Sequence, residues 1–133
     1  YREGSGFATE AIAELQAIMQ RDVGAFRTGA GLQRALDGIA VLAARLPGMS
    51  TAGPRNFNQQ RSDWFALRNM LEVARAITTA ALARQESRGA HQREDHPGLD
   101  EAWTHHQVIR RAGEGIEMSR TEVRHLSPPE LSA

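Results

Sequence analysis

The chain has 133 residues, with 16 arginines, no lysine, 16 acidic residues, five histidines and no cysteine, so its formal net charge is zero. This length fits one domain, and the charge balance gives no support to a nucleic-acid partner or to a membrane-surface role. The lack of cysteine excludes disulfides, thiolate zinc sites, iron–sulfur ligands and a thiol nucleophile. No apolar run approaches the ~20 residues that cross a bilayer, and no signal-peptide pattern is present. We therefore expect a cytoplasmic protein without direct membrane insertion.

Two helices are expected in the first third of the chain. Residues 1–8 contain two glycines and a serine and predict a flexible lead-in. Thr9 is the expected N-cap of the first helix, whose apolar residues recur at spacings of three and four over 12–26. The second helix is predicted over 32–46 by one apolar stripe, and Pro47 with the following glycine ends it.

The third expected helix is the longest and follows a polar loop over residues 47–61. Ser62 is placed to cap it, and its apolar face extends to Ala81. Helices joined by short connections pack antiparallel, so residues 9–99 predict a three-helix bundle domain.

The last part of the chain, residues 100–133, has a weaker pattern. A short helix is expected over 100–111 around Trp103, and alternation from Ile116 onward predicts one extended strand or a poor hairpin. The prolines at 128 and 129 would end it. The predicted fold class is therefore all-α, an antiparallel three-helix bundle with an irregular C-terminal tail that contains a short strand or hairpin. The tail is expected to pack on the bundle or on a neighbouring domain.

The densest polar segment is Glu86-Ser87-Arg88-Gly89-Ala90-His91-Gln92-Arg93-Glu94-Asp95-His96-Pro97. One interpretation places its arginines on a dicarboxylate, with His91 as an acid–base group near neutral pH. The other interpretation is a helix C-terminus joined to a neighbour by ion pairs, with Gly89 in the left-handed conformation just after the helix. We favour the second, because structural ion networks imitate active sites.

Metal binding and catalysis receive little support from the remaining residues. Four histidines between 91 and 106, together with Asp95 and Asp100, are of types that bind zinc, but their spacings match no established ligand pattern. Adjacent residues on a helix point ~100° apart, so His105 and His106 would not face one metal. Neither a glycine-rich phosphate loop nor a Gly-x-Ser-x-Gly elbow is present. We expect no catalytic residue, metal or cofactor in this chain alone.

The string from Glu86 to Asp95, with Pro97 after it, resembles a signature late in the flavoprotein subunits of fumarate reductase and succinate dehydrogenase. L-aspartate oxidases of the same superfamily have related strings. Two upstream segments, Leu15-Gln16-x-Ile18-Met19 and Leu67-Arg68-Asn69-Met70-Leu71, look like the first and third helices of the family's C-terminal domain. Downstream, Trp103, His106 and the Pro128-Pro129 pair are similar to the family's tail and favour the fumarate reductase and succinate dehydrogenase branch.

This resemblance implies a division of labour within a longer flavoprotein that interconverts fumarate and succinate. In the family, FAD sits in a Rossmann-like domain, and the dicarboxylate is held by that domain and a capping domain. Both would lie upstream of Tyr1, so the resemblance assigns no flavin-binding residue here. The implied partners are these two domains of the same polypeptide and an iron–sulfur subunit, which would place the protein at the inner face of a membrane.

The resemblance gives the polar segment a docking role, because buried charged groups need partners. The predicted docking residues are Glu86, Ser87, Arg88, Gly89, His91, Arg93, Asp95, Trp103 and His106. Without its neighbouring domains this surface is expected to be exposed and to promote self-association. Three alternatives stay open: the C-terminal domain of an L-aspartate oxidase, a free-standing helical interaction module, and a small metal- or dicarboxylate-binding protein built on Arg88, His91 and Arg93.

Overall fold

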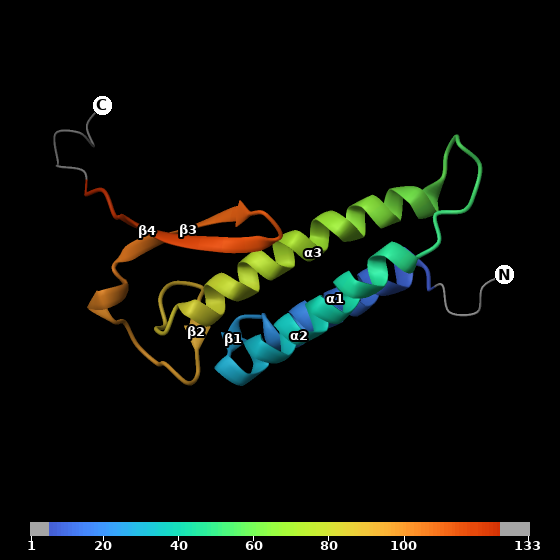
Figure 1. The fold of residues 1–133 in the computed structure, drawn as a ribbon. Helices are drawn as coiled ribbons and strands as arrows, with labels where there is room; N and C mark the ends of the chain where they lie inside the picture. Colours follow the sequence, from blue (N-terminus) through green and yellow to red (C-terminus); the bar gives the residue numbers. More distant parts are fainter. Residues whose placement is uncertain (1–5, 126–133) are drawn as a thin grey trace, which may run out of the picture.

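Three antiparallel helices form the body of the protein, as Figure 1 shows. The computed structural model describes residues 6–125. Helix α1 spans Ala8–Asp22, α2 spans Gly29–Arg45 and α3 spans Gln59–Ala83. A short 3-10 turn over Leu46–Gly48 continues α2 before the loop that leads to α3. None of the described helices is long and apolar enough to cross a membrane.

Side-chain caps set the starts of two of these helices. Thr28 and Asn58 each accept a hydrogen bond, 3.0 Å long, from the amide three residues later. Helix α2 therefore begins three residues before its predicted start, and α3 begins inside the predicted loop. The predicted caps Thr9 and Ser62 are wrong: Phe7 precedes α1 without a side-chain cap, and Asn58 caps α3.

The apolar core lies between the three helices. Its residues recur at helical spacing, so each helix contributes one stripe and leaves its other side to solvent. The main cluster of buried residues is Ala8, Ala11, Leu15, Ile39, Leu42, Leu46, Met49, Leu67, Leu71 and Ala74, and a second cluster is Val23, Leu32, Ala35 and Ala81. The indole Nε1 of Trp64 donates to the carbonyl of Leu46 over 2.9 Å, which joins α3 to the end of α2.

Two small sheets accompany the helices, so the prediction of an all-α fold is wrong. Strand β1 (Phe26–Arg27) pairs in parallel with β2 (Gln92–Arg93), and β3 (His105–Ala112) pairs antiparallel with β4 (Gly115–Glu122). The short helix predicted over 100–111 is also wrong. There the chain forms only a 3-10 turn over three residues and then enters β3, whose side chains point alternately to the two faces of the hairpin.

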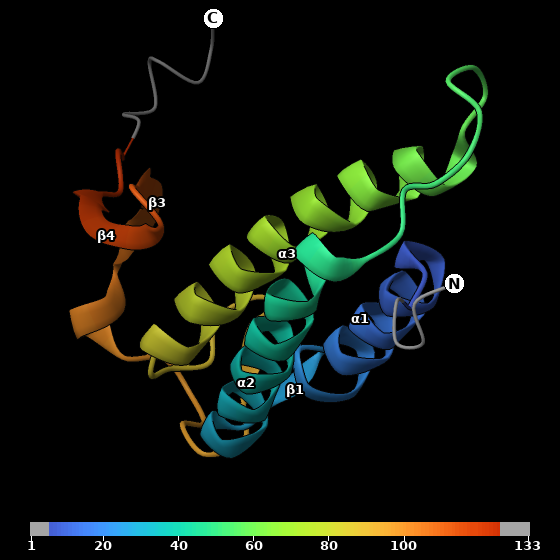
Figure 2. The ribbon, with the colours of Figure 1, turned by 45° about the vertical axis from the view of Figure 1, so that its right-hand side comes forward.

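The β3–β4 hairpin lies beside α3, and Figure 2 shows it on the opposite side of α3 from α1. Gly113, at φ +59°, occupies the first position of its two-residue turn, where a positive φ is required. Gln107 and Arg111 contact α3, so the hairpin face that holds them, together with Ile109 and Ile116, is directed toward the helices. We call this face the inner face of the hairpin.

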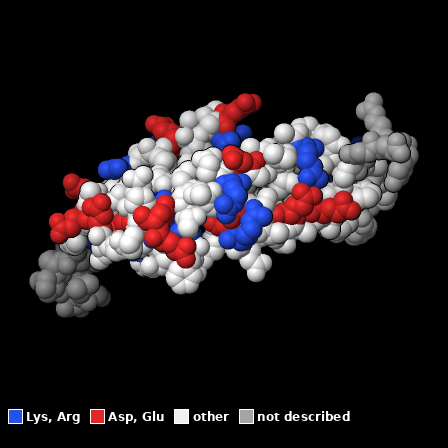
Figure 3. Space-filling view, turned by 90° about the horizontal axis from the view of Figure 1, so that it is seen from below, with Lys and Arg blue, Asp and Glu red and all other residues white. Residues whose placement is uncertain are grey.

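One face of the molecule carries side chains of both charges. Figure 3 shows acidic and basic side chains interspersed with uncharged surface there. The chain as a whole has equal numbers of acidic and basic residues.

Candidate functional site

Eight of the nine predicted docking residues lie at the end of the bundle where α3 ends and α2 begins. After Ala83 the chain leaves the helix and forms an irregular loop over residues 84–104, which includes β2 and the 3-10 turn. Because β2 pairs with β1, this loop lies against the start of α2. We call this part of the molecule the loop end of the bundle.

Glu86 is the centre of the first polar cluster in the loop end. Its side chain is fully buried, and its carboxylate accepts hydrogen bonds from Arg84, from Arg88 at 2.8 and 3.1 Å, and from the amide of Asp100 at 2.9 Å. The Arg88 hydrogen bond is the main cause that lowers the pKa of Glu86 to about 2, against the opposing effect of burial. A buried carboxylate with these donors is ionised at neutral pH and has its partners within the chain.

Arg84 connects this cluster to the hairpin. Its guanidinium donates to the carbonyls of Trp103 at 3.0 Å and His105 at 2.8 Å, and to the side-chain oxygen of Gln107 at 3.1 Å. It thereby joins the C-terminus of α3 to the first residues of β3. The planar guanidinium, with five N–H groups, suits this arrangement, which a lysine could not reproduce.

Arg93 and Asp95 form the second polar cluster, between two helix ends. Arg93 is buried, and its guanidinium forms two 2.7 Å hydrogen bonds to Asp95 while also donating to the last carbonyls of α3, those of Ala81 and Leu82 at 3.1 Å. Asp95 accepts from the amide of Gly29, the first residue of α2, at 2.9 Å. A cation at a helix C-terminus and an anion at a helix N-terminus are each favourable. The Arg93 hydrogen bonds, followed by that of the Gly29 amide, lower the pKa of Asp95.

His91 is held in its neutral form by the groups around it. Its Nδ1 lies 2.9 Å from a guanidinium nitrogen of Arg27, which can only donate, and its Nε2 lies 3.1 Å from the carbonyl of Arg84, which can only accept. The ring therefore carries its proton on Nε2. Burial lowers the pKa of His91, and the nearby charges of Arg27, Arg93 and Arg84 lower it further. A neutral histidine in this position fixes the loop but has no free nitrogen for acid–base chemistry.

Ser87 and Gly89 shape the loop between these clusters. The Ser87 hydroxyl accepts from the amide of Arg93 at 2.9 Å and donates to the carbonyl of His96 at 2.8 Å. Gly89, at φ +57°, lies in a tight turn in which Arg88 and His91 exchange backbone hydrogen bonds. The expectation that Gly89 follows the helix directly is wrong, because α3 ends at Ala83 and Gly89 belongs to the turn.

The two predicted tail residues lie in different surroundings. Trp103 stacks on His105 with ring centroids 5.2 Å apart, and the guanidiniums of Arg84 and Arg120 lie 5.4 and 4.8 Å from its ring centroid. His106 is exposed on β3, on the opposite face of the hairpin from His105. The structure thus brings eight of the predicted residues to the loop end and leaves His106 apart from their hydrogen-bonded clusters.

The sequence analysis did not single out Arg84 or Arg27, although Arg84 binds Glu86 and Arg27 binds His91, which it did single out. Arg84 could have been identified from its position just after a long helix, where an arginine is favourable. Arg27 pairs with residues more than 60 positions away, and nothing in the local sequence indicates this.

The start of α2 is the described segment that can be compared with a phosphate-binding turn. The start of α2 most resembles a phosphate-binding turn, because it follows β1 and begins Gly29-Ala30-Gly31. However, Asp95 and Thr28 already accept from the amides of Gly29 and Gly31. Within residues 6–125, no group of three or more histidine or acidic side chains could hold a metal ion.

The loop end also exposes large apolar side chains next to its paired charges. Phe26 of β1 is 72% exposed and Leu99 of the loop is 71% exposed. The loop end therefore combines polar groups that pair within the chain with exposed apolar side chains. The fold and the site define a helical domain with two small sheets and an internally paired polar end.

Comparison with known proteins agrees with this class. The sequence profile of the family described as "Fumarate reductase flavoprotein C-term" matches residues 12–131. The chain belongs to this family of C-terminal domains of fumarate reductase and succinate dehydrogenase flavoproteins, and the resemblance found from the residues is confirmed.

Three relatives illustrate the likeness. The fumarate reductase flavoprotein subunit of Mycobacterium tuberculosis is 39% identical over 108 residues, which are 77% of this chain and 18% of that protein. An L-aspartate oxidase of Rhodospirillum rubrum is 44% identical over 95 residues, 71% of this chain and 28% of that protein. The structure titled "Mycobacterium smegmatis Sdh1 complex in the apo form" matches with a TM-score of 0.87 and 33% identity over 97% of this chain and 23% of the other. The chain thus spans less than a third of each relative.

Proposed function

We propose that this chain is the structural C-terminal domain of an FAD-dependent flavoprotein that interconverts fumarate and succinate. One observation carries the proposal: the family profile covers residues 12–131, whereas the chain spans 18% of the M. tuberculosis flavoprotein subunit. The flavin, the substrate and the catalytic residues would then belong to the rest of the polypeptide. No catalytic residue is assigned to the chain itself.

In this proposal the loop end docks on the flavin-binding and capping domains of the same polypeptide. The internal ion pairs of Glu86 and Arg93 make the surface rigid, so that docking orders few groups. The exposed Phe26 and Leu99 supply apolar area, and the half-exposed Trp103 adds an aromatic side chain of the kind enriched at interfaces. The same exposed residues would promote self-association of the chain by itself.

The domain division and the wider assembly also belong to this proposal. In it, residues 9–99 are the bundle domain, residues 1–8 a lead-in and residues 100–133 the tail. Residues 1–5 and 126–133 of these segments lie outside the described range, and α1 begins at Ala8, one residue before the proposed domain boundary. The M. smegmatis relative is described as a complex, which supports a subunit partner for the parent protein. We propose an iron–sulfur subunit as that partner, at the inner face of a membrane.

The L-aspartate oxidase branch is the second candidate, and the 44% identity to the R. rubrum protein favours it. The two candidates differ in the substrate of the parent protein. A flavoprotein completed by this chain would be assayed for succinate oxidation, fumarate reduction and L-aspartate oxidation, and the substrate turned over assigns the branch.

The first test separates a structural domain from a flavin-binding protein. FAD is added to the purified chain, excess flavin is removed, and the visible absorption spectrum is recorded. We expect no flavin band, because the start of α2 is occupied by Asp95 and Thr28. A retained stoichiometric band would overturn the proposal.

The second test addresses docking. The chain is produced together with the M. tuberculosis flavoprotein subunit from which the matching C-terminal segment has been deleted, and retained FAD is measured. We expect the chain to restore FAD retention. Phe26→Ser and Leu99→Ser should each weaken the restoration, whereas Val41→Ser, an equally apolar exposed site on α2, should not. Equal effects of the three substitutions would show that the loop end is not the docking surface.

A further inference from the structure

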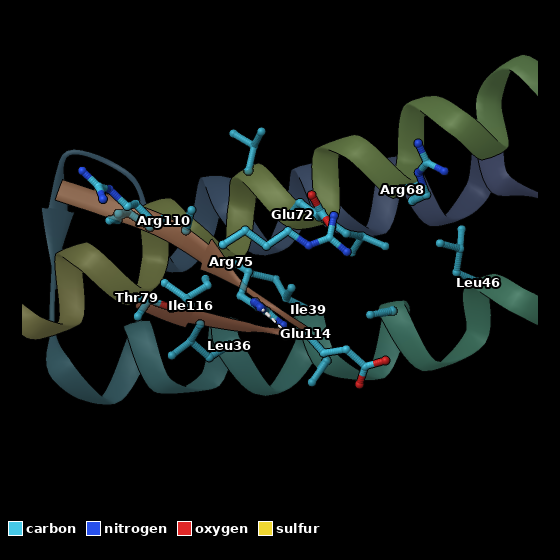
Figure 4. Close-up of a pocket in the computed structure, with 17 residues that line it drawn as sticks. Leu36, Ile39, Leu46, Arg68, Glu72, Arg75, Thr79, Arg110, Glu114 and Ile116 are labelled. Carbon is cyan, nitrogen blue, oxygen red and sulfur yellow. Dashed lines mark hydrogen bonds and ion pairs between the residues drawn. The ribbon is translucent and has the colours of Figure 1, made fainter. Parts of the chain in front are cut away.

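A deep groove separates the hairpin from the helices. Its volume is about 770 Å³, and its walls are α2, α3 and the inner face of the β3–β4 hairpin. Figure 4 shows Arg110 near one end of the residues drawn and Arg68 toward the other end, next to Leu46, with Leu36, Ile39 and Ile116 between the two arginines. We call this feature the hairpin groove.

The hairpin groove is apolar on both of its long walls. Leu36, Ile39 and Ala43 of α2 line the helical wall, and Ile109 and Ile116 line the hairpin wall. Protein interiors are close-packed, so two apolar surfaces that face each other normally meet. The space between these walls has room for an apolar group of considerable size.

Polar contacts hold the hairpin at this distance from the helices. Arg75 of α3 donates to the carbonyl of Glu114 in the hairpin turn at 2.8 Å, and Arg111 of β3 pairs with Glu72 of α3 at 3.1 Å. These contacts are at the turn end of the hairpin, and the bonds of Arg84 are at its other end. The hairpin is therefore supported at both ends while its apolar middle stays apart from α2.

The rim of the groove is basic. Four arginines line it against two glutamates. Arg75 and Arg111 have the partners given above. Arg68 lies with its guanidinium carbon 5.3 Å from the centroid of the Phe65 ring, and neither Arg68 nor Arg110 forms a hydrogen bond or ion pair with another residue of the range 6–125. A guanidinium without a carboxylate partner beside an apolar cleft suits a carboxylate or phosphate group on an apolar ligand.

The dimensions favour a small molecule over a polypeptide. Along α2 the groove extends from Leu36 to Leu46, which corresponds to about 15 Å of helix axis. A helix of that length, about 10 Å across with side chains, occupies on the order of 1,200 Å³, so only part of it would lie inside the groove. An extended peptide would bring amides and carbonyls against apolar walls that cannot pair them. The volume lies within the ~300–1,000 Å³ of small-molecule pockets.

We propose that the hairpin groove binds an anionic amphiphile, a molecule with a linear apolar tail and one carboxylate or phosphate head. The tail lies between α2 and the inner face of the hairpin. The head pairs with Arg68 of α3 or with Arg110, which starts on the outer face of β3 and lines the edge of the groove. This site is separate from the loop end, and the proposal does not depend on the reaction of the parent protein.

The test is a calorimetric titration of the 133-residue chain with dodecanoate below its micelle concentration. We expect one site per chain, with weaker binding of the shorter octanoate and of dodecyltrimethylammonium, which has the same tail and the opposite charge. A parallel titration with phosphatidylglycerol vesicles tests whether a membrane surface is bound instead.

Two matched pairs of variants locate the site. Ala43→Phe fills the groove and should weaken dodecanoate binding by about tenfold or more, whereas Ala44→Phe, one position along the same helix and outside the groove, should leave it within about twofold. Arg68→Gln combined with Arg110→Gln should weaken binding by about tenfold and remove the preference for the anionic head, whereas Arg61→Gln should not. Circular dichroism on each variant checks that it folds.

Three results would overturn the proposal. The first is the absence of dodecanoate binding at concentrations up to about 1 mM. The second is equal binding by the Ala43→Phe and Ala44→Phe variants, which would place the amphiphile elsewhere. The third is binding to phosphatidylglycerol vesicles alone, which would show a membrane surface as the occupant.

Discussion

Removal of the Glu86 carboxylate should be among the most damaging single changes in the chain. Glu86→Ala leaves Arg84, Arg88 and the amide of Asp100 without their shared acceptor in a buried site. Removing one member of a buried ion pair costs about 3–5 kcal/mol, because the remaining charges lose their partner. For a chain of this length that corresponds to a fall in Tm of about 11–18 °C.

Thermal and urea unfolding followed by circular dichroism would measure this effect, with Glu14→Ala as the matched control. Glu14 pairs with Arg45 on the surface, where both side chains are nearly half exposed, so its loss should cost less than about 1 kcal/mol. If Glu86→Ala destabilises the chain no more than Glu14→Ala does, the buried cluster does not contribute as argued.

The same cluster predicts a pH dependence with a definite sign. The folded pKa of Glu86 is about 2, below its ordinary value of 4.5, so the folded state binds this proton less tightly than the unfolded state. Its contribution to stability is therefore complete above about pH 4.5 and is lost as the pH falls toward 2. The difference in unfolding free energy between the natural chain and Glu86→Gln should shrink over this range. A difference that stays constant with pH would contradict the ionised, buried carboxylate.

Three further predictions concern other contacts. Gly29→Ala would place a Cβ 2.9 Å from the Asp95 carboxylate and should lower the unfolding free energy, measured by urea unfolding, by about 1–2 kcal/mol. Gly38→Ala is the control, because the nearest atom to its Cβ is the terminal methyl of an isoleucine side chain, which can move away. This substitution should be neutral or stabilising. Arg93→Lys should lower the unfolding free energy by about 2–4 kcal/mol and speed up amide hydrogen exchange at the end of α3. A smaller loss of stability than that from the same substitution at a surface arginine would refute the role of Arg93 in holding this helix end. Because the pKa of His91 is lowered in the folded chain, the stabilisation by its neutral ring is present above the unfolded pKa of 6.5 and is lost as the pH falls below it. Between about pH 7 and pH 5 the unfolding free energy should therefore fall more steeply in the natural chain than in His91→Gln. Parallel plots of unfolding free energy against pH for the two proteins would count against the neutral ring.

The helices could be predicted from the sequence because their information is local. Leu15, Leu67 and Leu71 repeat at helical spacing, and each is buried in the core as this pattern requires. The starts of the helices were harder to predict from the sequence, because a capping residue such as Asn58 lies in a segment rich in residues that also form loops.

The strands could be predicted only in part: alternation from Ile116 onward did predict the strand that is β4, but β1, β2 and β3 were not predicted. Each strand of the β1–β2 pair has two residues, and the register joins Phe26 to Gln92, so no local window contains both partners. In β3 the inner face includes His105, Gln107 and Arg111, and this mixture hides the alternation that marks a strand with one apolar face.

The sequence identified the residues of the polar segment but not their hydrogen-bond partners. These residues do lie together in the structure. The prediction was that their charges would need partners from another domain. The partners of Glu86 instead come from the same chain, including an amide 14 positions later, because the loop turns back on itself. A sequence shows which charged residues are near one another along the chain. It does not show whether a loop folds back so that those charges form pairs.

The pairing of Arg93 with Asp95 has a consequence for local unfolding. One side chain holds the last carbonyls of α3 and the other holds the first amide of α2, so neither helix end can fray while the pair is intact. Helix ends usually open independently and exchange their amide hydrogens at unrelated rates. Here opening of the loop releases both ends at once. The amides of Gly29 and Glu94, which are 65 positions apart, should therefore exchange with solvent as a single cooperative unit.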